Sequence, residues 1–66
     1  MKIQLNGEPF TLEDEQTIAG LIASIDVGAK RYAIEVNEAI IPRSQYAEYS
    51  LSAGDVVEVV VAIGGG

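Results

Sequence analysis

The sequence contains no cysteine and no histidine. These residues supply most catalytic nucleophiles, general bases and transition-metal ligands, so their absence argues against a self-contained enzyme and against a metal site. Lack of cysteine also excludes the disulfide scaffold that small secreted domains often need, and a cytoplasmic protein is the simpler interpretation. No apolar stretch approaches the roughly 20 residues of a membrane-spanning helix, and no signal segment opens the chain. We therefore expect a soluble, single-domain, non-enzymatic protein with no membrane partner.

Basic side chains are also scarce. Four lysines and arginines face ten acidic residues, which gives a formal net charge of −6. This charge argues against a nucleic-acid partner, because phosphates would repel the chain. Two interpretations of the charge stay open, attraction to basic protein surfaces and solubility alone. At 66 residues the chain can bury only about 60% of its unfolded surface, so one modest aliphatic core must hold it together.

The first half of the chain alternates between the periods of strands and of a helix. Apolar and polar residues alternate over residues 2–5, and Asn6-Gly7 is typical of a tight hairpin turn that needs positive φ. The return strand contains Pro9, which lacks a donor and favours a sheet edge. Thr17 is a suitable N-cap for the helix that follows, and Gly28 is expected to end it. The apolar stripe of that helix consists of Ile18, Leu21, Ile22 and Ile25.

The second half returns to strands. Residues 32–36 alternate as a strand, Asn37-Glu38 is a candidate turn, and residues 39–41 form a short strand stopped by Pro42. Residues 43–49 show no clean period and are interpreted as a loop or a short helical turn. An Ala-Gly-Asp turn then leads into the last strand. This order predicts an α+β fold with a mixed sheet of four to five strands and one main helix packed on one face.

The last strand is apolar on both sides, which is typical of a central strand. Because one helix covers only one face of a sheet, we expect the other face to stay partly open. Val60 and Tyr49 are predicted to lie there in an exposed apolar patch that binds a partner. Arg43 is a second candidate contact, for acidic groups of a partner, with a solvated loop charge as the alternative. The acidic residues 13–15 are interpreted as a solvated turn before the helix rather than a metal site.

Three glycines, Gly64, Gly65 and Gly66, end the sequence directly after the apolar strand. Without Cβ atoms they form a thin segment that is free in φ and ψ. Fully extended, it spans about 10 Å, enough to carry a terminal carboxylate into another protein's active site. We therefore divide the chain into a folded domain, residues 1–63, and a flexible tail, residues 64–66. From composition alone, a frayed terminus is the alternative.

Together these features resemble the ThiS-type sulfur carriers of thiamin biosynthesis, which belong to the ubiquitin-like β-grasp proteins. The resemblance spans nearly the whole chain, and its most specific part is a strand followed by a terminal diglycine. The Asn-Gly and Gly-Asp turns are common and carry little weight. The residues that carry the resemblance are Ile41-Pro42-Arg43 with Tyr46 soon after, Gly54-Asp55 before an apolar strand, and Ile63-Gly64-Gly65-Gly66.

The resemblance implies a chemical role for the tail. In this family an E1-like adenylyltransferase activates the terminal carboxylate with ATP and Mg²⁺, and the carrier itself binds no cofactor. Sulfur from a cysteine desulfurase or another donor then yields a thiocarboxylate, here on Gly66, which donates its sulfur to thiazole synthase. Gly64 and Gly65 would enter the partner's active site. Two alternatives stay open, the same tail chemistry in molybdopterin synthesis or in a ubiquitin-like modifier, and a non-covalent binding module with an idle tail.

Overall fold

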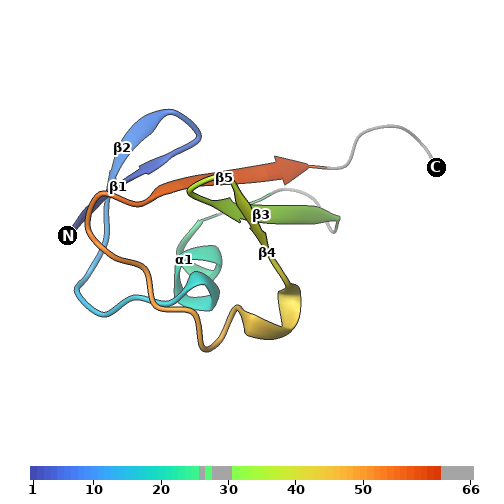
Figure 1. Cartoon of the computed structure of the whole chain (residues 1–66). Coiled ribbons are helices and arrows are strands. Elements are labelled where there is room, and N and C mark those ends of the chain that lie inside the picture. Colours follow the sequence, from blue (N-terminus) through green and yellow to red (C-terminus); the bar gives the residue numbers. More distant parts are fainter. Residues whose placement is uncertain (26, 28–30, 62–66) are drawn as a thin grey trace.

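The computed structural model describes residues 1–25, 27 and 31–61. Within them one α-helix lies against one face of a five-stranded mixed sheet, and a short 3-10 helix joins the last two strands (Figure 1). The α+β class and the strand–helix order predicted from the sequence are confirmed. The predicted tail boundary between residues 63 and 64, and the tail itself, lie outside the described residues.

The first hairpin joins β1 (Lys2–Leu5) to β2 (Glu8–Thr11). Its turn residues Asn6 and Gly7 have φ values of 52° and 83°, the left-handed conformation that this dipeptide tolerates. β2 is an edge strand, as Pro9 indicated, because proline has no N–H to donate to a further strand. The turn predicted from the sequence is therefore confirmed.

The helix α1 (Ile18–Ser24) begins at the expected cap, since the Thr17 hydroxyl accepts a hydrogen bond of 3.1 Å from the backbone N–H of Gly20. Ile18 and Leu21 are completely buried beneath the sheet, and Ile22 and Ile25 pack at the edge of the core. The helix ends earlier than predicted. Ile25 is its C-cap and adopts an extended conformation, so the chain leaves the helix before Gly28.

The second hairpin joins β3 (Tyr32–Val36) to β4 (Ala39–Ile41) and is followed by the 3-10 helix η1 (Arg43–Gln45). The last strand, β5 (Val56–Val61), lies in the middle of the sheet, whose order is β2-β1-β5-β3-β4. β5 is parallel to β1 and antiparallel to β3. Its predicted central position is therefore confirmed.

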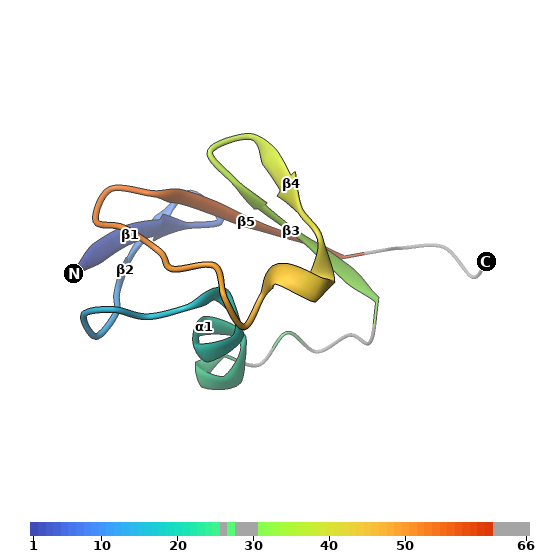
Figure 2. The ribbon, with the colours of Figure 1, turned by 60° about the horizontal axis from the view of Figure 1, so that its bottom comes forward.

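The core lies between the sheet and α1 (Figure 2). Alternate strand residues point into it, among them Ile34, Val36 and Val57, which are almost wholly buried. Their neighbours in sequence point to the opposite face, which we call the open face. Among the described residues no buried side-chain nitrogen or oxygen lacks a hydrogen-bond partner, and no described helix is long and apolar enough to cross a membrane.

Candidate functional site

The strand β5 carries the chain to the C-terminal glycines and is held from both sides. It pairs with β3 over five residues, from Val57 to Val61, and with β1 through Val56 and Val57 only. β5 thus extends past the end of β1, and its last residues lie at the opposite end of the sheet from Met1 (Figure 1). This long pairing with β3 fixes the course of β5 up to Val61.

Two asparagines add side-chain anchors for β5. The Asn6 side-chain oxygen accepts a hydrogen bond of 2.8 Å from the backbone N–H of Val59, just beyond the point where β1 ends. On the other side, the Asn37 side-chain oxygen accepts from the N–H of Val56 at 2.9 Å. The Asn37 amide nitrogen also donates to the carboxylate of Asp55 at 3.1 Å. Sequence reasoning identified both asparagines as turn residues and missed these contacts, because side-chain bonds to a strand 19 or 53 residues away leave no local pattern.

The open face of the sheet exposes apolar side chains on its central and edge strands. Val60 is 44% exposed and Val56 39% exposed on β5, and Ile40 is 69% exposed on β4. Ala33 is the cross-strand partner of Val60 and extends the apolar surface onto β3. The predicted exposed position of Val60 is confirmed. Its role in binding a partner stays a prediction.

Tyr49 does not share this face. Its backbone oxygen accepts a hydrogen bond of 3.1 Å from the N–H of Ile18 at the start of α1, and its half-buried ring packs against the core. The predicted grouping of Tyr49 with Val60 is therefore wrong. Because residues 43–49 have no clear period, no pattern in the sequence indicates that this segment crosses to the helix side of the molecule. A partner contact by Tyr49 at that separate surface stays a prediction.

Two carboxylates face each other in the middle of the open face. Glu35 on β3 and Glu58 on β5 are direct cross-strand partners. Their neighbour on β4 is Ile40, opposite Glu35. Like charges directly opposite each other destabilise an antiparallel pair. The open face is therefore apolar at its margins and acidic at its centre.

This arrangement gives the first prediction. The substitution Glu58→Lys should raise the free energy of unfolding by about 0.5–1 kcal/mol, because it replaces repulsion with attraction to Glu35. For a domain of this size the midpoint of thermal unfolding should rise by roughly 3–6 °C. Glu48→Lys makes the same change in charge at an exposed site in the segment after η1, and should produce a smaller shift. Equal shifts in both variants would show that only the net charge matters.

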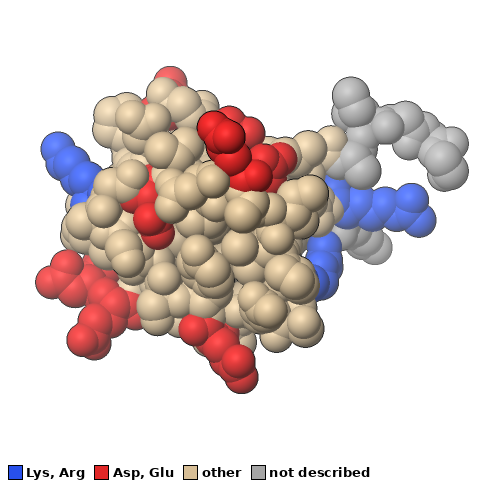
Figure 3. Space-filling model, viewed as in Figure 1, with Lys and Arg blue, Asp and Glu red and all other residues tan. Residues whose placement is uncertain are grey.

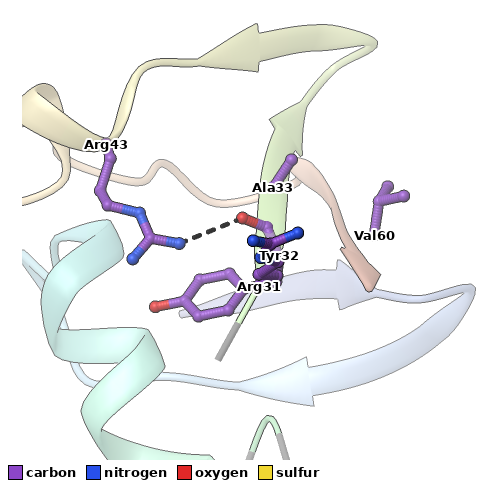
Figure 4. A pocket seen from close by; sticks show the side chains of 5 residues that line it. All are labelled: Arg31, Tyr32, Ala33, Arg43 and Val60. Atoms are coloured by element: carbon purple, nitrogen blue, oxygen red, sulfur yellow. Dashed lines mark hydrogen bonds between the residues drawn. The ribbon is translucent and has the colours of Figure 1, made fainter. Parts of the chain in front are cut away.

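Arg43 lies beside the start of β3, where its guanidinium covers the ring of Tyr32 at 4.7 Å from the ring centroid (Figure 4). One guanidinium nitrogen also donates a hydrogen bond of 3.3 Å to the Tyr32 backbone oxygen. Arg43 lines a pocket of about 370 Å³ together with Arg31, Tyr32, Ala33 and Val60. Sequence reasoning identified Arg43 and Val60 as candidate partner contacts. It missed the other three lining residues, which are Arg31, Tyr32 and Ala33. These residues were missed because the pairing of β3 with β5 brings the lining residues together, and the register of that pairing joins residues far apart in the chain.

The acidic turn before α1 is exposed at Glu13, Asp14 and Glu15. The Asp14 carboxylate lies 3.4 Å from the N-terminal amine of Met1. Among residues 1–25, 27 and 31–61, no group of three or more acidic side chains is arranged to hold a metal ion. The three terminal glycines of the predicted site lie outside the described residues.

The fold and this site geometry can be compared with known proteins. The model of the ThiS family matches residues 3–66, nearly the whole chain and including all three terminal glycines. The chain belongs to the ThiS family. The resemblance to the ThiS-type sulfur carriers of thiamin biosynthesis, predicted from the sequence, is thereby confirmed.

Individual relatives agree with the family match. The chain is 38% identical to the sulfur carrier protein ThiS of Bacillus subtilis over 97% of its own length and 98% of that protein. A crystal structure of the thiamine biosynthesis protein ThiS from Geobacter metallireducens has a TM-score of 0.88 at 26% identity, and each chain is covered completely. The β-grasp fold implied by the resemblance is thus confirmed.

The chain also resembles part of a larger protein. It is 41% identical over its full length to a segment of a thiazole synthase from Magnetococcus marinus, and it spans only 20% of that protein. A thiazole synthase from Paramagnetospirillum magneticum matches in the same way, again over 20% of its length. In these two organisms a ThiS-like segment is therefore part of the thiazole synthase polypeptide.

Proposed function

We propose that this chain carries sulfur as a thiocarboxylate on Gly66 and delivers it to thiazole synthase for the thiazole ring of thiamin. The observation that carries the proposal is the family match through residue 66, which includes the glycine tail. The thiazole synthases that contain a ThiS-like segment support the same acceptor, because joining two proteins in one polypeptide keeps them at high effective concentration.

The chemistry begins with a poor electrophile. A terminal carboxylate is ionised at neutral pH, so a sulfur nucleophile cannot displace either of its oxygens directly. In the first proposed reaction step, the Gly66 carboxylate attacks the α-phosphorus of ATP in the active site of an E1-like adenylyltransferase, and pyrophosphate leaves. Sulfide from a donor can then attack the carbonyl carbon, so that AMP leaves and the thiocarboxylate forms directly. If the terminal sulfur of a persulfide made by a cysteine desulfurase attacks instead, AMP leaves and the product is an acyl disulfide. A thiol then reduces its S–S bond and releases the thiocarboxylate. ATP and Mg²⁺ belong to the activating enzyme, and this chain supplies the reacting acyl group.

The glycines suit this role for a steric reason. A side chain on Gly66 would crowd the approach of the nucleophile to the carbonyl carbon. Gly64 and Gly65 keep the tail narrow, and their backbone groups can pair with the walls of a partner's channel. In this proposal the chain is a protein substrate that partner enzymes act on in the cytoplasm, and its own contribution is the reacting acyl group of Gly66.

The acceptor is tested with purified thiazole synthase that lacks a carrier segment. We expect the thiocarboxylate form of this chain to support formation of the thiazole phosphate product, and the carboxylate form to support none. The large subunit of molybdopterin synthase is the comparison acceptor. Sulfur transfer to that subunit alone would move the carrier to the molybdopterin pathway. Transfer to neither acceptor would contradict the proposal.

The open face is the proposed docking surface, and Val60 is its test residue. Val60→Asp places a charge on an exposed apolar position next to Ala33, so it should weaken binding of the activating enzyme by more than about tenfold. Calorimetric titration measures the affinity. Ala53→Asp introduces the same charge in the exposed turn before β5 and should leave binding unchanged. Unaltered affinity in the Val60 variant, or loss of its circular dichroism signal, would count against this surface.

A further inference from the structure

Both arginines of this acidic chain lie at one end of the sheet. Arg31 and Arg43 line the same pocket, next to Val60 near the end of β5. In Figure 3 basic side chains lie together on the right, the side where β5 ends in Figure 1, and one more lies at the upper left, while acidic side chains occupy the left, the bottom and the upper middle of the same view. The end of the sheet from which the tail continues is thus locally positive in a protein of net charge −6.

Arg43 is held in place before any partner arrives. Stacking on Tyr32 and the bond to its backbone oxygen fix the guanidinium plane, and this bond uses one of the five N–H donors. The remaining donors form a rigid fork of the kind that binds carboxylates through two hydrogen bonds. Because the side chain is already ordered, less conformational entropy is lost when a partner binds.

The pocket between the two arginines is lined by apolar groups. Tyr32, Ala33 and Val60 supply the rest of its lining, and the volume of about 370 Å³ is large enough for an apolar side chain (Figure 4). A matching partner surface would present an apolar side chain flanked by carboxylates. A phosphate-rich partner is a poorer match, because the rest of the chain is acidic.

The length of the tail indicates where such a surface lies. Five residues, 62–66, follow Val61, so a fully extended tail spans up to about 17 Å. The carboxylate at the end of such a tail is well beyond the reach of an arginine side chain anchored beside β3. When the tail is inside a partner, the arginines therefore face the entrance of the channel and not the reacting atoms.

We propose that Arg31 and Arg43, with the apolar pocket between them, dock onto an acidic and apolar rim around the tail channel of the enzyme that activates Gly66. This inference rests on the proposed function and adds to it a site and a partner chemistry. The arginines act as positioning residues. They attract and orient the carrier so that its tail faces the channel, while the acidic remainder of the surface disfavours the reverse orientation.

The test uses charge reversal with a matched control. Arg31→Glu and Arg43→Glu each change the net charge as Lys2→Glu does, but Lys2 begins β1 at the other end of the sheet. Pyrophosphate release by the purified E1-like enzyme of the same organism is measured against carrier concentration with ATP and Mg²⁺. We expect KM to rise about fivefold or more in each arginine variant relative to Lys2→Glu, with kcat unchanged, and the difference to shrink at high salt. Arg43→Lys should recover part of the loss, and Arg43→Gln replaces Arg43→Glu if the reversed charge unfolds the domain.

The outcomes separate this inference from the proposed function. If the wild-type chain is activated and the arginine variants match Lys2→Glu, or lose kcat at constant KM, the docking site is wrong and the carrier role stands. If the E1-like enzyme releases no pyrophosphate with the wild-type chain, although it is active on another carrier, both the carrier role and the docking site are wrong.

Discussion

Removal of Gly66 is expected to lower activation of the carrier by at least about a hundredfold while leaving the domain folded. The shortened chain still ends in glycine, but its carboxylate is withdrawn by roughly 3.3 Å. A displacement of about 1 Å from productive geometry can already cost a factor of about a hundred in rate. Pyrophosphate release with the E1-like enzyme measures the loss, and circular dichroism reports on the fold.

A second variant separates length from crowding. Gly66→Ala keeps the carboxylate at its distance and adds a methyl group at the reacting residue. It should be activated poorly but better than the truncated chain. If the truncated chain were activated as well as the wild type, the carboxylate of Gly66 could not be the reacting group, and the binding-module interpretation would replace the carrier.

Ile34→Ala is expected to have the largest effect on stability. Ile34 is completely buried at the centre of the sheet, where an isoleucine-to-alanine change costs about 3–4 kcal/mol through lost burial and the cavity left behind. A domain of 66 residues has a total stability of roughly 3–10 kcal/mol. The midpoint of thermal unfolding should therefore fall by about 20 °C, or the variant should be unfolded at room temperature.

The chain offers a matched control in the same hairpin. Ile40 on β4 is 69% exposed on the open face, so Ile40→Ala removes the same atoms from a position that is largely in water. Its unfolding midpoint should change by only a few degrees. Similar losses in both variants would show that the open face is buried in solution, for example in a dimer, and sedimentation would then reveal the association.

Much of the fold could be predicted because its signals are local. Asn6-Gly7 specifies a turn that needs positive φ, Thr17 is a helix cap, and the stripe from Ile18 to Ile25 identifies the buried face of α1. The apolar character of the last strand on both sides predicted its central position. Each of these features depends on residues that are close in sequence.

The parts that could not be predicted depend on register and on long-range packing. The opposition of Glu35 and Glu58 follows from the pairing of β3 with β5, and a shift of one residue would remove it. The same register brings Val60 to the arginine pocket. Tyr49 was misplaced because its position depends on a backbone bond to Ile18 in α1, which no pattern within residues 43–49 reveals.

The central claim is that Gly66 is converted to a thiocarboxylate, and intact mass spectrometry tests it most directly. After incubation with the E1-like enzyme, ATP, Mg²⁺ and a sulfur donor, the protein should gain the mass difference between sulfur and oxygen. Fragmentation must place the gain on Gly66, since oxidation of the only methionine, Met1, adds nearly the same mass. A gain confined to Gly66 and dependent on ATP is the predicted result. An unchanged C-terminal fragment, with an enzyme shown to be active on another carrier, would contradict the account.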